Sequence, residues 1–520
     1  MGKSVIEFLK KLLTPLRIIF SRAAVTLLLI AAELFTLFVM FEWLQPHIPW
    51  IEGLIRLAAA ATVIYLASRG RHPSSDMMWV VVILVIPVGG ILVYAIVEGF
   101  LSRHSRTYVR IREETASARK YYRQDEVILR CADSDSSDYP GQIRSIVEAA
   151  GFPVYENRGY RYFPNGETAL PAILAALERA EKFIFLEVFT IEPGKMWDAI
   201  RKVLQKKAQQ GVEIRVMYDD MGSFQTLPAC DTKELEESGI RAMVFNRVNP
   251  VINGIMNHRD HRKILVIDGK TAFTGGINIA DQYINETHPY GYWKDNSVEM
   301  TGNAVWSFTV MFLTLWNALN KEDTDYRKYR AELIFGGKTD GWIIPYADTP
   351  LDDRLTARDI YLNILNQARN YCYIFTPYLV IDNEMRGALT RAAQRGVDVA
   401  LITPGIPDKK LIYDITRSHY RGLIAGGVKI FEYTPGFDHA KVFVCDDVIA
   451  TVGSINLDYR SLYLHFEDGT YLYGSAEVHA VRDDLREAMA VSHPVTYAES
   501  RISGIRRIGI DIVSIFAPLM

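Results

Sequence analysis

The chain has 520 residues, more than the roughly 250–300 at which a single hydrophobic core stops growing, so we expect at least two structural units. Hydrophobic residues make up 49% and charged residues 23%, which excludes a disordered chain. The net charge of −3 gives no sign of the basic domain that is typical of a dedicated nucleic-acid binder. The cysteines include no C-x-x-C pair, so we predict buried free thiols at Cys131, Cys230, Cys372 and Cys445.

Residues 1–100 are predicted to form a membrane region. Apolar runs at residues 23–44 and 77–97 can each cross a hydrocarbon core of about 30 Å, and a shorter run at residues 54–68 either crosses or lies re-entrant. The first run is too long for a signal-peptide core and no cleavage site follows it, so we expect an uncleaved anchor. Residues 101–130 form a basic linker, either a solvated helix face or a segment touching anionic headgroups.

Beyond residue 130 the chain alternates short β-rich runs with amphipathic stretches, which predicts an α/β fold. The order strand, helix, strand occurs twice, so we expect tandem domains at residues 131–330 and 331–520, the second ending in an apolar tail. That tail is either an interfacial element or a helix packed on the domain. The repeated elements are predicted at about residues 183–188, 197–210 and 212–218, and at 371–375, 383–395 and 397–402.

One motif, H-x-K-x-x-x-x-D, occurs in each predicted domain. Its two copies are His261, Lys263 and Asp268, and His439, Lys441 and Asp446. Each copy is followed by a small residue and an asparagine, Asn278 or Asn456. The histidines are 178 residues apart (439 − 261 = 178), and so are the asparagines (456 − 278 = 178). One copy alone could equally be a strand edge with surface charges, but equal spacing favours a repeated site.

These residue types suit phosphodiester chemistry. Histidine and lysine two residues apart share one face of a strand, and the small residue after the turn permits close backbone approach to phosphate oxygens. One neutral imidazole can attack phosphorus while the other, protonated, donates to the leaving alkoxide, and an unperturbed pKa of about 6.5 suits both roles. Lys263 and Lys441, assisted by Asn278 and Asn456, would stabilise the charge without a metal. Three other histidines lack the motif spacing and are predicted to be bystanders: His258, His419 and His465.

The paired motifs resemble the HKD signature of the phospholipase D superfamily, and the surrounding sequence is similar to bacterial cardiolipin synthases over nearly the whole chain. The resemblance implies two tandem phospholipase D-like α/β domains that form one pseudo-twofold active site, preceded by an N-terminal helical membrane anchor. The segments that carry it are Glu187, residues 218–223, residues 293–295, residues 376–378, residues 427–433, residues 456–461, Phe466 and Glu467, and Pro87, Gly89 and Tyr94 in the apolar region.

The resemblance also implies roles for single residues. Asp295 would orient His439 and Glu467 would orient His261, each acid coming from the opposite half. His261 would be the nucleophile, with His439 as the acid and later the base. The two motif aspartates would brace their strands rather than touch substrate.

The chain departs from the family pattern just before each motif. Asp260 stands where the family usually has asparagine, and Asp438 where it usually has leucine. Residues 296–297, Asn-Ser, also replace the family's usual Thr-His. Extra carboxylates beside the histidines could raise the histidine pKa or alter the choice of headgroup.

The function that the resemblance implies is phosphatidyl transfer between two phosphatidylglycerol molecules, without a cofactor or a metal. The expected partners are phosphatidylglycerol, other anionic phospholipids and the membrane, with no nucleic acid, and a homodimer is left open. The expected location is the bacterial inner membrane, with several spans and the catalytic domains on the cytoplasmic side. The alternatives are a phospholipase D and, less favoured, an HKD nuclease. A noncatalytic scaffold is disfavoured because both motifs are complete.

Overall fold

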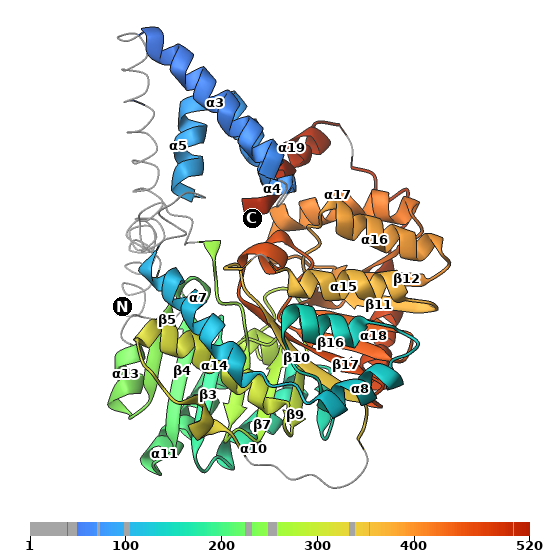
Figure 1. Ribbon diagram of the computed structural model, residues 1–520. Helices are drawn as coiled ribbons and strands as arrows, with labels where there is room; N and C mark the ends of the chain where they lie inside the picture. Colours follow the sequence, from blue (N-terminus) through green and yellow to red (C-terminus); the bar gives the residue numbers. More distant parts are fainter. Residues whose placement is uncertain are drawn as a thin grey trace, which may run out of the picture.

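In the computed structural model, the described residues are 39, 49–69, 73–97, 105–223, 231–247, 257–331, 339–352, 354–502 and 504–519. Two α/β halves lie side by side, and helices from the N-terminal region stand beside the C-terminal helix at one end (Figure 1).

The first half is built on a seven-stranded sheet in the order β2-β9-β7-β6-β3-β4-β5. Its parallel part is β3-β4-β5, and the other pairs are antiparallel. All six residues of β3 are buried, because Phe183 and Phe185 face the centre of the molecule while Ile184 and Leu186 face outer helices. The strands are β2 (Tyr160–Phe163), β3 (Phe183–Val188), β4 (Glu213–Asp219), β5 (Arg241–Phe245), β6 (Ile264–Ile267), β7 (Thr271–Gly275) and β9 (Ser297–Thr301). The helices outside the central layer are α10 (Gly166–Glu178), α11 (Lys195–Gln209), α12 (Asp220–Ser223) and α13 (Asp231–Glu237).

The second half repeats this sheet. Its nine strands run β1-β10-β17-β16-β15-β11-β12-β13-β18, and the seven between the edge strands β1 and β18 match the first sheet position by position. The strands are β1 (Tyr155–Glu156), β10 (Trp342–Asp348), β11 (Tyr371–Phe375), β12 (Asp398–Pro404), β13 (Lys429–Tyr433), β15 (Val442–Cys445), β16 (Ile449–Gly453), β17 (Glu467–Tyr473) and β18 (His493–Pro494). The helices outside the central layer are α15 (Thr356–Gln367), α16 (Asn383–Gln394) and α17 (Lys410–Ala425). The predicted repeat of strand, helix and strand is confirmed as β3-α11-β4 and β11-α16-β12.

Two helices fill the space between the sheets, α14 (Val305–Asn320) and α18 (Glu477–Ala490). Most of α14 is buried, since its residues are apolar on every side and contact strands of both halves. A short parallel pair, β8 (Tyr292–Lys294) and β14 (Gly436–Asp438), also joins the halves. The two halves therefore share one central core.

The segment before the first sheet packs on the second half. Helices α8 (Glu126–Asp135) and α9 (Gln142–Arg144) contribute Leu129 and Ile143 to the outer core of that half, and β1 extends its sheet. The chain thus contacts the second half before it builds the first. Within the predicted basic linker, α7 (Arg106–Ala118) buries Tyr108 and Ile111 against α14.

The N-terminal helices differ from the predicted spans. The predicted single span at residues 77–97 is two helices, α4 (Pro73–Val85) and α5 (Pro87–Val97), because Pro87 has no N–H to continue α4 but suits the start of a new helix. The run at residues 54–68 lies within α3 (Pro49–Arg69), and the run at 23–44 falls outside the described residues apart from residue 39. Among the helices that the structure describes, none is both long and apolar enough to cross a bilayer.

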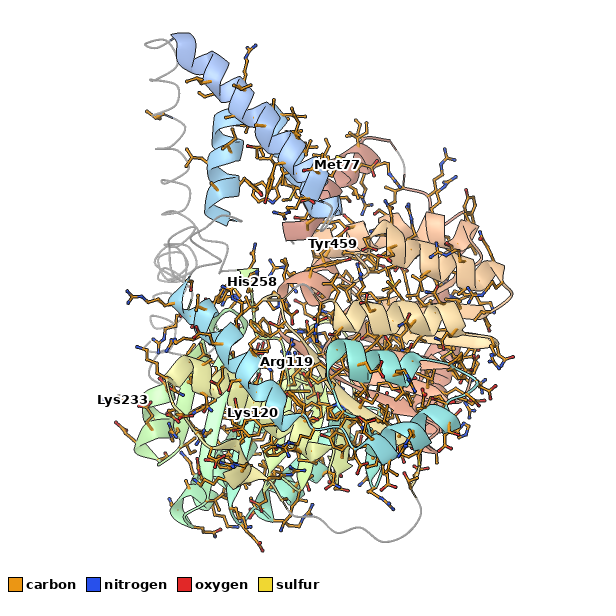
Figure 2. All side chains as sticks on the ribbon, viewed as in Figure 1. Met77, Arg119, Lys120, Lys233, His258 and Tyr459 are labelled. Atoms are coloured by element: carbon orange, nitrogen blue, oxygen red, sulfur yellow. The ribbon has the colours of Figure 1, made fainter. Side chains whose placement is uncertain are left out.

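The C-terminal helix α19 (Gly504–Ile515) contacts both α4 and α17, so the tail is at least partly packed. Met77 on α4 is exposed where these helices meet (Figure 2). The cysteines are only partly as predicted: Cys372 and Cys445 are buried free thiols, whereas Cys131 is exposed and Cys230 lies outside the described residues.

Candidate active site

The two motifs occupy equivalent hairpins. In each, histidine and lysine lie just before the strand, since β6 begins at Ile264 and β15 at Val442. The predicted placement on the strand itself is therefore wrong, by one residue for the lysines and by three for the histidines. The strands turn back through two residues with positive φ, Asp268 and Gly269 in the first half and the Asp-Asp pair that begins at Asp446 in the second. Two-residue turns of this kind suit the twist of a hairpin.

The motif aspartates lie at the far ends of these strands and bind backbone. The carboxylate of Asp268 accepts hydrogen bonds from the N–H groups of Glu181, Lys182 and Phe183 at 2.7–2.9 Å. In the second half, the carboxylate of Asp446 accepts three from residues 369–371, each at 2.8 Å, and a fourth from the hydroxyl of Tyr139 at 2.7 Å. Both aspartates tie the hairpin to the start of the neighbouring strand, and neither contacts the motif histidines.

Each motif histidine contacts an acid from the other half. His261 Nδ1 lies 3.0 Å from both carboxylate oxygens of Glu467, and His439 Nδ1 lies 2.6 Å from Asp295 Oδ2. The backbone repeats the exchange, because His261 N–H donates to Phe466 O at 2.9 Å and His439 N–H donates to Lys294 O at 2.6 Å. All four side chains of these two pairs are buried, and they lie where the resemblance places them.

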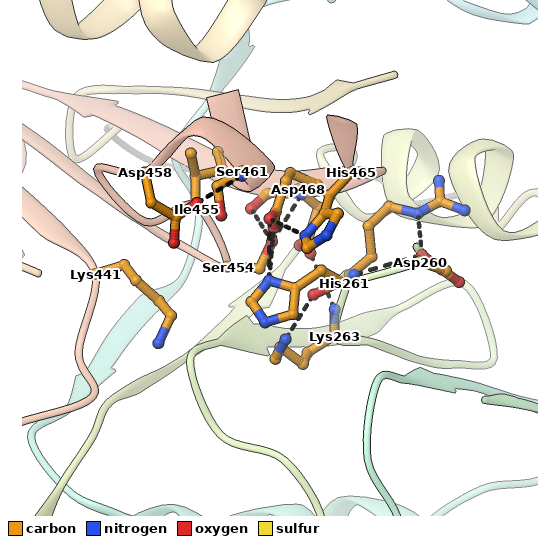
Figure 3. Close-up of polar contacts among 12 residues, drawn as sticks. Asp260, His261, Lys263, Lys441, Ser454, Ile455, Asp458, Ser461, His465 and Asp468 are labelled. Carbon is orange, nitrogen blue, oxygen red and sulfur yellow. Dashed lines mark hydrogen bonds and ion pairs between the residues drawn. The ribbon is translucent and has the colours of Figure 1, made fainter. Parts of the chain in front are cut away.

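The positive charges of the two motif lysines affect the pKa of both motif histidines. Lys263 Nζ donates to the carbonyl oxygen of His261 at 2.5 Å, and Lys441 Nζ lies 3.0 Å from His439 Nδ1. Burial, followed by the charges of the two lysines, holds the pKa of each histidine well below 6.5. Burial also lowers the pKa of each lysine to about 8. The mutual effects place the four side chains in one site, part of which is drawn in Figure 3.

The carboxylates that precede the histidines do not raise the histidine pKa. Asp260 forms an ion pair with Arg262 at 3.1 Å, and Asp438 accepts the N–H of Ala440 at 3.1 Å. Burial raises the pKa of Asp438 well above its usual value, with the charge of Lys294 opposing this shift. These carboxylates are thus engaged within the protein, and the expectation of a raised histidine pKa is wrong.

The small residues after the hairpins contact the two acids that hold the motif histidines. A Cβ on Gly276 would lie 2.0 Å from Asp295 Oδ1, so only glycine permits the acid to sit there. Its counterpart Ser454 donates its hydroxyl to Glu467. These positions therefore support the two acids, and the approach of their backbone to phosphate oxygens stays a prediction.

The two asparagines are buried near the site but differ in their contacts. The amide of Asn278 donates to the hydroxyl of Tyr283 at 2.7 Å, and the Tyr283 ring lies 5.5 Å from that of His439. The side-chain oxygen of Asn456 has no hydrogen-bond partner among the described residues. Asn278 thus contacts the second motif indirectly, through Tyr283. The side-chain oxygen of Asn456 remains available to accept a hydrogen bond.

Sequence reasoning missed several residues of the site. Asp468 on β17 accepts the N–H of Lys263 at 3.0 Å and the hydroxyl of Thr274, so it links the halves beside the first motif. His465 is no bystander: its ring centroid lies 5.7 Å from that of His261, and the two rings are adjacent in Figure 3. Trp293, one of the residues that carry the family resemblance, packs with its ring centroid 5.5 Å from that of His439, a contact that the sequence did not predict. Neither Asp468 nor His465 has a motif signal, because only folding brings them to the first half.

The comparisons agree with this architecture. The family described as "Cardiolipin synthase, PLD-like domain" matches residues 173–303 and 361–489, one segment in each half, and "Phospholipase D-nuclease N-terminal" matches residues 56–98. The crystal structure of phosphatidylserine synthase from Haemophilus influenzae is 14% identical, with a TM-score of 0.54 covering 72% of this chain and 96% of that one, which shows a common fold. Fold and paired motifs define a phospholipase D-like protein with two repeats.

Similarity to individual proteins assigns the chain to one family within the phospholipase D-like class. Cardiolipin synthase 2 of Bacillus anthracis is 31% identical over 88% of this chain and 89% of its own, and the cardiolipin synthase of Halalkalibacterium halodurans is 28% identical over 87% and 91%. An uncharacterized protein of Streptococcus mutans serotype c is 44% identical over 88% and 99%. The chain belongs to the cardiolipin synthase family.

Proposed function

We propose that this chain is a cardiolipin synthase that transfers a phosphatidyl group from one phosphatidylglycerol to a second, releasing glycerol and passing through a phosphohistidine. It is an enzyme of the phosphatidyltransferase class, and its substrates are phospholipids. The observation that carries the proposal is the pair of buried histidines, each held by an acid of the opposite half and flanked by both lysines.

In the first step His261 attacks phosphorus through Nε2. Its lowered pKa keeps this imidazole neutral, which is the nucleophilic form, and Glu467 at Nδ1 balances the positive charge that the ring acquires. The bond between phosphorus and the glycerol oxygen breaks, and His439 gives its proton to that oxygen. Lys263 and Lys441 offset the charge on the nonbridging oxygens.

His439 must carry a proton for that step, although its pKa is lowered in the free protein by burial and by the charge of Lys441. A phosphodiester anion between the lysines offsets the charge that depresses this pKa. Asp295, 2.6 Å from Nδ1, favours the protonated ring in the same way. Binding of the anionic lipid thus prepares the acid.

In the second step a hydroxyl of another phosphatidylglycerol attacks the phosphohistidine. His439, now neutral, takes the hydroxyl proton, and the phosphorus–nitrogen bond breaks to restore His261. Water attacking in place of the alcohol would give phosphatidic acid.

We place the enzyme at the bacterial inner membrane, held there by its N-terminal region, with the catalytic halves on the cytoplasmic side. Support comes from the apolar side chains that α3 and α4 expose, including Leu57, Ile64 and Leu84. A tethered site meets lipid alcohols at high local concentration, which favours transfer over hydrolysis. Reporter fusions at the C-terminus test the sidedness, and activity of the reporter only outside the cell would refute it.

The experiment for the reaction uses purified full-length protein in phosphatidylglycerol vesicles. Cardiolipin and glycerol in equal amounts support the proposal, phosphatidic acid indicates a phospholipase D, and cleavage of DNA alone excludes both. His261→Ala and His439→Ala should each abolish turnover, while the exposed His479→Ala on α18 should leave it unchanged. Label from the phosphate of the lipid should appear on the wild-type protein but not on His261→Ala. Full activity in either motif variant would exclude the two-histidine mechanism.

A further inference from the structure

His465 is a buried side chain that the proposed reaction does not use. Its side chain is 8% exposed, and neither ring nitrogen has a hydrogen-bond partner among the described residues. Glu467 Oε1 lies 3.6 Å from its Nδ1, which is beyond hydrogen-bond distance. A buried imidazole without partners is costly unless something else satisfies it.

The neighbours of His465 are suitable metal ligands. Ligand atoms of His261, His465 and Glu467 all lie within 4.8 Å of one another, and all three residues are buried. A tetrahedral zinc ion with ligands at about 2.0–2.1 Å separates adjacent donor atoms by roughly 3.3 Å. The observed separations from Glu467 bracket that value, at 3.0 Å to His261 Nδ1 and 3.6 Å to His465 Nδ1.

A cavity of about 390 Å³ borders the cluster on one side, at His465. Two aspartates, Asp348 and Asp352, line the same cavity, and the one arginine in its lining, Arg358, is already paired with Asp359 at 3.0 Å and Glu384 at 3.3 Å. The arginine of this lining is thus already paired with acids, so it does not oppose an incoming cation, whereas burial raises the pKa of Asp348 well above its usual value.

We propose that His261, Glu467 and His465 form a binding site for a transition-metal ion such as Zn²⁺, and that its occupation inhibits the enzyme. The ion takes the position of the proton between His261 Nδ1 and Glu467, and that proton leaves to solvent. The ring then cannot share its positive charge with Glu467 once Nε2 is phosphorylated. The inhibition rests on the proposed role of His261, whereas the metal binding does not.

The binding experiment uses full-length protein and zinc chloride, with competition against a chromogenic chelator. One Zn²⁺ per chain is expected, with affinity reduced at least about tenfold in His465→Asn, since loss of even an outer partner of a ligand has that effect. His479→Asn is the matched control and should bind as wild type does. His261→Asn should also bind more weakly, and this outcome does not depend on activity. No binding by the wild type, or equal affinity in His465→Asn, would overturn the site.

The activity experiment measures cardiolipin formation in phosphatidylglycerol vesicles as zinc is added. Each variant is compared with its own metal-free rate, and an equal melting temperature shows that His465→Asn folds. Zinc should inhibit the wild type and His479→Asn alike, EDTA should restore both, and His465→Asn should require at least about tenfold more zinc. Equal inhibition of all three proteins would place the inhibitory metal elsewhere and refute the proposal. Absent activity together with intact zinc binding would refute the proposed reaction alone.

Discussion

The variant Asp446→Asn tests whether the motif aspartate only stabilises its hairpin or also takes part in catalysis. Asparagine keeps one oxygen for the N–H groups of Asn370 and Tyr371 but turns an amide toward the N–H of Arg369 and the hydroxyl of Tyr139. The hydroxyl can rotate to accept from the amide, whereas the N–H of Arg369 cannot. Two charge-assisted hydrogen bonds become neutral, at about 1 kcal/mol each, and one donor loses its acceptor, at about 1 kcal/mol or more. The sum is about 3 kcal/mol, which lowers the melting temperature by roughly 6–12 °C for a unit of this size.

The assay is thermal unfolding at pH 7, followed by turnover at a temperature where the variant is folded. Asp447→Asn is the matched control at the same turn, because its ion pair with Arg482 is partly exposed and contributes less than about 1 kcal/mol. We expect folded Asp446→Asn to keep most of its activity. Turnover as low as that of Lys441→Ala in fully folded protein would refute the view that the motif aspartate acts only on the hairpin.

The same variant has a pH signature. Burial alone would raise the pKa of Asp446, but hydrogen bonds from Tyr371 and Arg369 outweigh burial and hold the pKa below 3.8. The carboxylate therefore contributes stability above about pH 4 and loses it as pH falls through the folded pKa. The stability gap between wild type and Asp446→Asn should narrow at low pH. A constant gap from pH 7 to pH 3 would contradict this.

Three further predictions concern turnover. Activity should fall as pH rises through about 8, where Lys263 and Lys441 lose their charge, and a kcat/KM profile flat to pH 9.5 would exclude that role. Glu467→Gln and Asp295→Asn should each lower kcat about 10²- to 10⁴-fold with little change in KM, as expected for groups that orient a catalytic imidazole. A change in KM alone would contradict this orienting role. Gly436→Ala should lower kcat sharply because its Cβ would lie 2.2 Å from a backbone oxygen of β8. The control Gly422→Ala should not lower kcat, because no atom lies within 4 Å of the added Cβ. Equal rates for the two variants would show that the strand pair joining the halves is dispensable.

Local patterns predicted the repeated layers well, for a physical reason. β3 and β11 are short, fully buried strands, so their sequences are apolar runs, interrupted in β3 only by Glu187. The expected residues 183–188 and 371–375 match the structure. The motif spacing likewise identified both hairpins. These features depend on residues close together in sequence.

Contacts between distant segments were beyond sequence reasoning. His465 and Asp468 belong to the second half by sequence but act beside His261 and Lys263 of the first, and no periodicity marks them. The lowered pKa of the histidines also arises from burial in a shared core, which composition does not reveal. The family resemblance supplied the two acid partners because it carries contact information that a single sequence lacks.

The exchange of acids between the halves has a consequence for biosynthesis. The first motif is synthesised early, yet its acid, Glu467, enters the chain more than two hundred residues later. A nascent chain therefore holds His261, the proposed nucleophile, without its acid until the second half has folded against the first. Turnover therefore requires that both halves have folded together, and a chain that ends before Glu467 should be inactive.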